Sequence, residues 1–320
     1  MKRRALRILQ RCGVFSLARA ALARRARILM YHNFSDDLDS SAGAVSASAA
    51  RSQLEYLRQR FQVVPLSHLV DRLHSNLPLE KNSVVLTIDD GRRNCYEIFF
   101  PLLREFEMPA TFFVVSSFIN GEDWIWTDKV LWLAGQPSRP PELSPDRIET
   151  HFAFLNRMRP AARTEHIDRI AAGMGSSMPR VPPAKYAPCS WSELREMADS
   201  GLVEIGSHTI SHPILSTLAD NEVGHELNDS RKQIEEGTGK KVRSFCFPNG
   251  KPEDYHSTQL QLVRDAGYSS AVVTRFGMPG RTANPYELPR IGVSGYSDPL
   301  TFAKCLDGTE FFQSRLLGYR

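Results

Sequence analysis

Two groups of polar residues in the sequence could do chemistry together. Asp89 and Asp90 are adjacent in V-V-L-T-I-D-D-G, and His208 and His212 stand four apart in G-S-H-T-I-S-H-P. Imidazole and carboxylate groups suit zinc and similar divalent metals. Each group alone has an ordinary explanation, because paired acids can cap a following helix and an H-x-x-x-H spacing is a weak signal. Together they predict a two-histidine, one-carboxylate metal set with positions left for water and substrate.

The stretches before these residues indicate how they are positioned. Residues 84–88 are apolar and rich in β-branched side chains, which predicts a buried strand that delivers Asp89 and Asp90 to a loop. Successive side chains of a strand point to opposite faces, so the two acids can share a site only if the chain turns there. Gly91 permits that turn. His32 and His208 likewise follow short apolar stretches.

Apolar strands alternate with helices along most of the chain. The expected helices are residues 51–60, 67–74, 92–106, 192–200, about 218–236 and 257–266, and the expected strands are 27–33, 61–64, 84–88, 109–115, 202–207, 243–247, 268–274 and 288–293. This alternation predicts an α/β fold, a distorted (β/α) barrel of seven or eight strands with its site at the carboxyl ends of the strands. His32, Asp89, Asp90 and His208 all occupy such ends.

The region at about 118–190 breaks the pattern. It holds Trp124, Trp126 and Trp132 and is then punctuated by proline, with amphipathic segments near 145–158 and 161–174. We interpret it as a helical insertion into a single barrel domain spanning 26–320. Its tryptophans could stack on sugar rings, although burial is the expected role for at least two of them. Residues 35–50 are small, acidic and serine-rich, which predicts a loop.

The positive charge of the chain is concentrated at its start. Residues 1–27 contain nine Lys or Arg and no acid, whereas the rest contains 31 basic and 36 acidic residues. A mildly acidic body argues against a nucleic-acid substrate. Residues 1–25 are expected to form one basic helix with Ile8, Phe15 and Leu22 on its apolar face. Such a helix could contact an anionic membrane, or it could pack on the barrel with its charges solvated.

Targeting and redox signals are weak. The five cysteines are scattered without a C-x-x-C pair, which favours buried free thiols in a reducing compartment. No apolar run approaches the ~20 residues of a membrane span, and Arg19 interrupts the one candidate signal-peptide core. We therefore expect the mature protein to start near Met1 and to be cytoplasmic, either free or peripheral to the inner face of the membrane.

The order of motifs from about residue 28 to 293 resembles the polysaccharide deacetylase family, the NodB-type carbohydrate esterases. The motifs are L-T-I-D-D-G, P-A-T-F-F-V-V, G-L-V-E-I-G-S-H-T-I-S-H-P, F-C-F-P-N-G, A-G-Y-S-S-A-V-V-T and L-P-R-I-G-V. The resemblance implies that Asp89 is the catalytic base and that Asp90, His208 and His212 hold the metal. The expected metal is zinc, with Co²⁺, Ni²⁺ or Mn²⁺ as alternatives. A divalent cation lowers the pKa of water from 15.7 towards about 7 and polarises an amide carbonyl.

The rest of the expected site departs from the family pattern. The oxyanion donor is the backbone N–H of Asn249, in a turn fixed by Pro248 and Gly250. Relatives usually have tyrosine at position 249, and many have arginine at the position of Cys246, so a partner that orients the base is missing. No late histidine follows residue 293, and His32 fits the general acid as in circularly permuted relatives. Arg290 either lines the site or forms a structural ion pair.

The resemblance implies a metal-dependent hydrolase that removes N-acetyl groups from a sugar of a polysaccharide, glycan precursor or glycolipid, in exopolysaccharide or surface-glycan assembly. No obligate protein partner is evident. Two alternatives remain open at the level of sequence. The same site chemistry would serve an amide or imide hydrolase acting on a small non-sugar molecule. The departures at Cys246 and the absent late histidine would instead fit a catalytically silent glycan-binding module.

Overall fold

The computed structural model describes residues 2–36, 43–175, 177–293 and 298–316. Its strands form one parallel sheet in the order β1-β8-β7-β6-β5-β4-β3-β2, and β1 also pairs with β3. That pairing closes seven strands into a barrel and leaves β2 beside the start of β3. The strands are β1 (Arg27–Tyr31), β2 (Gln62–Val63), β3 (Ser83–Ile88), β4 (Ala110–Val114), β5 (Val203–Ser207), β6 (Ser244–Cys246), β7 (Ser270–Phe276) and β8 (Leu288–Gly292).

The predicted α/β barrel is therefore confirmed, with seven strands in the closed ring. The remaining predicted strand, which corresponds to β2, is only two residues long and pairs with Ser83 and Val84 alone. Such a short strand cannot extend far enough to separate β3 from β4, which pairs with the other end of β3. The ring closes without it.

Alternation along the strands separates the inside of the barrel from its outside. Ile28, Val85, Phe113, Val272 and Leu288 pack in one cluster with the apolar face of α4 (Leu66–His74), which closes the amino end of the barrel. Their neighbours along each strand pack in the larger cluster beneath the outer helices. Because side chains two apart share a face, the inward positions continue from these residues toward the carboxyl ends of the strands.

The outer helices mostly match the expected positions. They are α3 (Ala47–Arg60), α4, α5 (Phe100–Phe106), α10 (Trp191–Asp199), α11 (Asp220–Thr238) and α12 (Ser257–Asp265). The helix expected over 92–106 is not continuous, since a π-helical turn, η1 (Cys95–Phe99), precedes α5. The expected loop at 35–50 gives way to α3 at Ala47, and its residues 37–42 lie outside the described residues.

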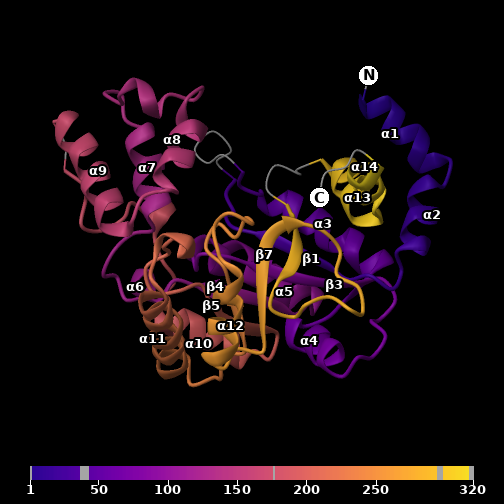
Figure 1. Cartoon of the computed structure of the whole chain (residues 1–320). Helices are drawn as coiled ribbons and strands as arrows, with labels where there is room; N and C mark the ends of the chain where they lie inside the picture. The colour runs from indigo at the N-terminus through magenta and orange to yellow at the C-terminus, as the bar shows by residue number, and fades with distance from the viewer. Residues whose placement is uncertain (1, 37–42, 176, 294–297, 317–320) are drawn as a thin grey trace.

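The predicted insertion is helical and has a small core of its own. It consists of α6 (Ser116–Ile119), α7 (Trp126–Ala134), α8 (Ile148–Leu155) and α9 (Pro160–Gly173). Trp126, Leu133, Leu155 and Ile167 pack together with Ile214 from the loop after β5. Figure 1 shows α7, α8 and α9 projecting on one side of the molecule, with the N-terminal helices on the opposite side. The insertion is thus anchored to the barrel through the segment that carries the two histidines.

The basic N-terminal segment forms two helices rather than the single helix expected. These are α1 (Lys2–Arg11) and α2 (Val14–Ala21), separated at Gly13, whose φ of 77° is left-handed. Phe15 and Leu22 are buried, whereas Ile8 is 61% exposed. The two helices lie beside α13 (Pro299–Asp307) and α14 (Thr309–Leu316), which the sequence analysis did not anticipate (Figure 1). The helix is interrupted at this left-handed glycine, and the predicted apolar stripe is buried only in its second half.

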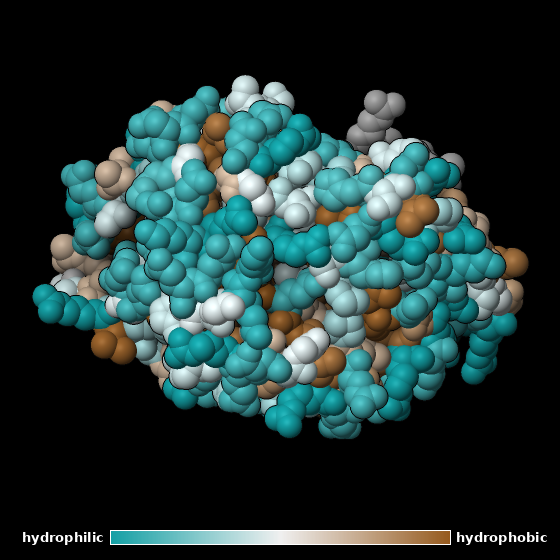
Figure 2. All heavy atoms as spheres, turned by 90° about the horizontal axis from the view of Figure 1, so that it is seen from below, coloured by the Kyte–Doolittle hydropathy of each residue, from teal (hydrophilic) through white to brown (hydrophobic). Residues whose placement is uncertain are grey.

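Four of the nine basic residues at 1–27 are bound by the body of the protein. Arg19 pairs with Asp307 at 2.7 Å, and Arg24, Arg25 and Arg27 donate to backbone carbonyls. Among the residues of α1 whose side chains are described, Arg4, Arg7 and Arg11 are exposed arginines. No described helix is both long enough and apolar enough to span a bilayer. Seen from the side of α4, the surface is mainly hydrophilic, with apolar side chains in small scattered groups (Figure 2).

Candidate active site

The two adjacent aspartates share one site because the chain turns sharply between them and the next residues. Asp89 continues the inward face of β3, and Asp90 adopts a left-handed φ of 79°. Gly91 follows with a φ of 84°, and a Cβ there would lie 3.0 Å from side-chain atoms of Val114 and Ile119. Glycine is the residue that fits this turn without strain. The predicted turn is therefore present, and it aims both carboxylates at the carboxyl end of the barrel.

The two histidines lie on a loop rather than on one helix face. His208 follows β5 directly, and Thr209 and His212 both have positive φ values, 72° and 55°. Glu226 of α11 accepts the backbone N–H groups of Ile210 and Ser211 at 2.7 and 3.1 Å. This acid, which the sequence analysis missed, holds the loop in the conformation that brings the two imidazoles together.

The donor atoms of Asp90, His208 and His212 fit a divalent metal. The Nε2 atoms of both histidines lie 3.7 Å from Asp90 Oδ1, and the three donor atoms are all within 4.8 Å of one another. Two ligands that are each about 2.1 Å from a shared ion stand roughly 3.4–3.7 Å apart at tetrahedral or slightly wider angles. Separations of 3.7 Å are too long for hydrogen bonds. The three residues are 2–6% exposed, so a cation held there is shielded from solvent.

The surroundings of these side chains lower their pKa values, which favours the protonation states that bind a metal. Burial lowers the pKa of His208, and it lowers the pKa of His212 to about 3, so both rings are neutral at pH 7. His208 donates from Nδ1 to the carbonyl of Cys246 at 2.7 Å, which leaves the Nε2 lone pair facing Asp90. Burial has the largest single effect on the pKa of Asp90 and raises it, but the charge of Arg92 and the nearby histidines together outweigh burial, and the net pKa lies below its usual value.

Arg290 holds Asp89. Its Nη1 and Nη2 each donate at 2.7 Å to a different carboxylate oxygen, while Nη1 also reaches Thr87 and Nε donates to the carbonyl of Val273. Burial has the largest single effect on the pKa of Asp89 and raises it, but the charge and hydrogen bonds of Arg290, with smaller contributions from His32 and His208, give a net lowering. Arg290 is fully buried behind the carboxylate, so the expectation that it lines the substrate site is corrected: it forms the ion pair.

In this ion pair, Arg290 occupies the space beside Cys246, the position at which many relatives are expected to have arginine. Cys246 is buried, with its sulfur 3.5 Å from Asp89 Oδ2 and 3.2 Å from Arg290 Nη2. The guanidinium that many relatives carry at this position on β6 is here supplied from β8. All five cysteines are free thiols as expected, and four are buried while Cys12 is exposed.

A second buried arginine, which the sequence analysis did not single out, holds Asp90. Arg92 donates to Asp90 Oδ2 from Nη2 at 2.9 Å and from Nε at 3.3 Å, and its Nη1 lies 2.5 Å from Asp128 Oδ2. Burial raises the pKa of Asp128 to about 6. The position of Arg92 directly after D-D-G was the one feature of the sequence that could have drawn attention to it. Nothing in the local sequence predicts its contact with Asp128.

His32, the predicted general acid, lines the cleft beside Asp89. It follows β1, and its Nε2 is 3.7 Å from Asp89 Oδ2. The His32 side chain is 37% exposed, while Asp89 beside it is buried. An imidazole that faces both the base and the solvent-accessible cleft can deliver a proton to a substrate held between them.

Asn249 also faces the cleft, whereas Pro248 is buried and does not line it. Asn249 has a left-handed φ of 58°, and its side chain donates to Asp254 at 2.6 Å. Among the described residues, its backbone N–H has no acceptor. The turn thus carries a backbone donor that is free among the described residues, and its role at an oxyanion stays a prediction.

A cleft of about 770 Å³ opens over these groups. His32, Asp89, Asp90, His208 and His212 line its floor, and the insertion forms much of its wall. The wall residues from the insertion are Trp126, Thr127, Leu131, Gly135, Glu149, Phe152, Ala153, Asn156, Lys185 and Tyr186. Trp124 and Trp126 are buried, and Trp126 also donates from its indole to the carbonyl of His212 at 3.1 Å.

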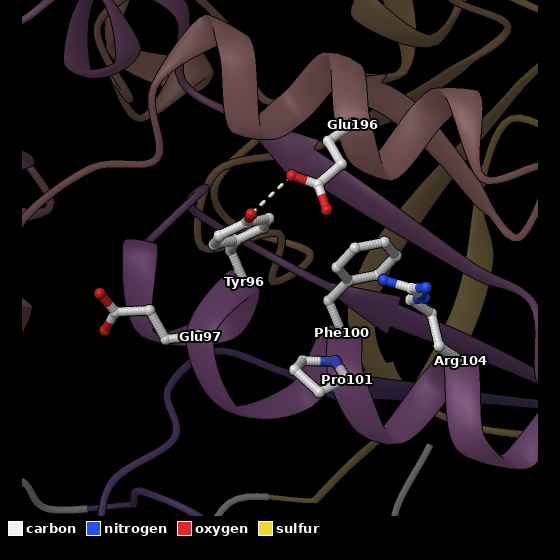
Figure 3. A pocket seen from close by; sticks show the side chains of 6 residues that line it. All are labelled: Tyr96, Glu97, Phe100, Pro101, Arg104 and Glu196. Atoms are coloured by element: carbon white, nitrogen blue, oxygen red, sulfur yellow. Dashed lines mark hydrogen bonds between the residues drawn. The ribbon is translucent and has the colours of Figure 1, made fainter.

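Another hollow, of about 460 Å³, lies outside the barrel between η1, α5 and α10 (Figure 3). The Tyr96 hydroxyl donates across it to Glu196 at 2.7 Å, beside Phe100 and Arg104. It shares no lining residue with the cleft, and no histidine is among its lining residues. The chemistry therefore lies in the cleft.

Comparison with known proteins gives a family match and similar folds. The polysaccharide deacetylase family model matches residues 76–271. The poly-β-1,6-N-acetyl-D-glucosamine N-deacetylase of Escherichia coli is 33% identical over 183 residues, which is 57% of this chain but 20% of that protein. The chain thus spans about a fifth of the length of this curated relative.

Two solved structures share the fold. The Streptococcus pyogenes deacetylase PplD, solved with acetate, superposes with a TM-score of 0.62 at 18% identity, covering 88% of this chain and 98% of that one. IcaB from Ammonifex degensii gives a TM-score of 0.62 at 21% identity, covering 88% and 97%. At these identities the similarity establishes the fold alone.

Proposed function

Because the chain belongs to the polysaccharide deacetylase family, we propose that it hydrolyses N-acetyl groups of sugar units in a polysaccharide, glycan precursor or glycolipid. The observation that carries the proposal is the convergence of Asp90, His208 and His212 within 4.8 Å, beneath a cleft that also holds Asp89 and His32. Family membership supports an amide-hydrolysing enzyme, and the cleft supports a substrate larger than a single acetamide.

We assign the metal to Asp90, His208 and His212, and zinc is the first candidate, since its preferred nitrogen and oxygen ligands are those present. When bound, a divalent cation polarises the amide carbonyl and makes water a stronger nucleophile. Asp89 accepts the proton of the attacking water. Its ion pair with Arg290 keeps it ionised and fixes its orientation.

His32 then protonates the leaving amine, and the backbone N–H of Asn249 donates to the oxyanion that forms on the carbonyl carbon. Both departures from the family pattern therefore have a counterpart: Arg290 stands in for the arginine absent at Cys246, and His32 for the absent late histidine. This weakens the case for a catalytically silent binding module.

The direct test is acetate release from N-acetylglucosamine oligomers with β-1,6 linkage, chosen because the E. coli relative is named for that polymer. Oligomers with β-1,4 linkage and small amides or imides complete the panel. Release from glycans that disappears after chelation and returns with Zn²⁺ is expected. Hydrolysis of small amides alone would favour the non-sugar alternative, and turnover unchanged after complete metal removal contradicts the mechanism.

We further propose that α1 makes peripheral contact with an anionic membrane surface. Arg4, Arg7, Ile8, Leu9 and Arg11 are all exposed on it, which supports combined electrostatic and apolar binding. Arg19, Arg24, Arg25 and Arg27 are instead bound by the body of the protein. The contact is thus confined to α1 rather than to the whole arm.

A further inference from the structure

The buried carboxylates of Asp90 and Asp128 both bind the guanidinium of Arg92, beside the proposed metal ligands. Asp90 Oδ2 and Asp128 Oδ2 both accept from Arg92, and the three residues are 5%, 0% and 7% exposed in that order. Asp128 Oδ1 has no hydrogen-bond partner among the described residues. Asp90 comes from the barrel and Asp128 from α7 of the insertion, so Arg92 joins two parts of the chain that fold as separate clusters.

The charges in this chain of contacts affect any cation held by Asp90. Asp90 is the only anionic member of its group, since His208 and His212 are neutral. An arginine paired with Asp90 alone would neutralise that charge in a site of low dielectric, where the effect is strong. Because Asp128 also binds Arg92, the three residues together retain one negative charge.

The same end of α7 also contacts the loop that carries His208 and His212. Trp126, two residues before Asp128, donates from its indole to the carbonyl of His212 at 3.1 Å. The first turn of α7 therefore contacts the segments that carry two of the three proposed ligands. A role confined to packing the insertion would not require a buried ionic contact at this point, because burying a charge is costly unless it is paired.

We propose that Asp128 is a positioning residue of the metal centre: by binding Arg92 it preserves the negative charge that attracts the cation to Asp90. This inference rests on the proposed function, since it assumes that Asp90, His208 and His212 hold a divalent metal. It makes the insertion part of the metal centre as well as a wall of the cleft.

The test measures Zn²⁺ affinity of the full-length apo protein by competition with a chromophoric chelator at pH 8. Asp128→Asn is expected to weaken binding by about 10- to 100-fold, the usual cost of losing a partner of a metal ligand. The double variant Arg92→Gln/Asp128→Asn removes the unbalanced cation and is expected to recover most of that loss, to within about fivefold of wild type. Asp123→Asn breaks the partly buried ion pair with Lys129 of α7 and should leave the affinity unchanged.

The outcomes separate this inference from the proposed function. A double variant that binds no better than Asp128→Asn, or an Asp128→Asn affinity equal to wild type, overturns the inference alone. If Asp128→Asn does not fold, the charge-balanced double variant decides, and binding more than about tenfold weaker than wild type overturns it. A wild-type protein that binds no Zn²⁺ overturns the proposed function together with this inference.

Discussion

Arg290 grips both carboxylate oxygens of Asp89, with Nη1 2.7 Å from Oδ1 and Nη2 2.7 Å from Oδ2, across 201 positions of sequence. The pairing joins β8 to the end of β3 through the inside of the barrel, since both side chains occupy inward positions. It fixes the orientation of the proposed base and keeps it ionised. From β8, the arginine thereby makes the contact with the proposed base that many relatives are expected to make from position 246.

Replacing Arg290 should impair catalysis without removing the metal. In Arg290→Met the pKa of Asp89 rises, because the cation that lowers it is gone while burial remains. We expect kcat/KM to fall by about 100-fold and the acid limb of its pH profile to move to higher pH. Arg290→Lys keeps the positive charge but loses the two-point contact with the carboxylate. Its kcat/KM should lie between those of wild type and Arg290→Met. An unshifted acid limb in a folded variant would contradict this role.

His32→Ala tests the general acid. Loss of proton delivery to the leaving amine should lower kcat on an N-acetyl sugar by about 10²- to 10⁴-fold, with Zn²⁺ affinity unchanged. On 4-nitrophenyl acetate, whose leaving group needs no proton, the loss should be much smaller. The matched control is His68→Ala, because His68 is exposed and pairs with Glu80 away from the cleft. Equal losses on both substrates would exclude His32 as the acid.

The buried histidines predict an acid-sensitive apo protein. The folded-state pKa of His212, about 3, lies below the ordinary value of 6.5, so the unfolded state binds more protons between these values. Stability is therefore fully present above pH 6.5 and is lost as the pH falls toward 3. We expect the free energy of unfolding to drop by about 2 kcal/mol between pH 7 and 5.

Chemical denaturation of the chelated protein at a series of pH values measures this slope. His212→Gln should flatten it, whereas His225→Gln should not, because His225 is exposed and bound only to Asp229 on its own helix. A slope that His212→Gln leaves unchanged contradicts the proposed burial of a neutral imidazole.

Membrane contact through α1 is tested by charge reversal. The variant Arg4→Glu/Arg7→Glu/Arg11→Glu should lose sedimentation with vesicles that contain anionic lipid, while binding by wild type should weaken as salt increases. Reversing three exposed arginines elsewhere gives the same net charge and serves as the control: Arg104, Arg157 and Arg264. Equal loss in both variants would indicate attraction by overall charge rather than by α1.

The sequence alone determined the frame of this protein. Apolar strands at regular intervals predicted a parallel barrel, and the chemistry at their carboxyl ends, Asp89, Asp90, His208 and His32, could be read from local order. That prediction was possible because side chains alternate strictly along a strand. A residue two positions after an inward-facing apolar residue therefore also points inward. The turn at Gly91 was predictable for the same local reason.

Only the tertiary structure decided which charges meet. Arg290 with Asp89, and Asp128 with Arg92 and Asp90, are pairs from distant elements that become neighbours when β1 pairs with β3 and the insertion packs on the loop after β5. A single sequence carries no periodic signal for such contacts, because their energy comes from desolvation and charge in a closed core rather than from local backbone preference.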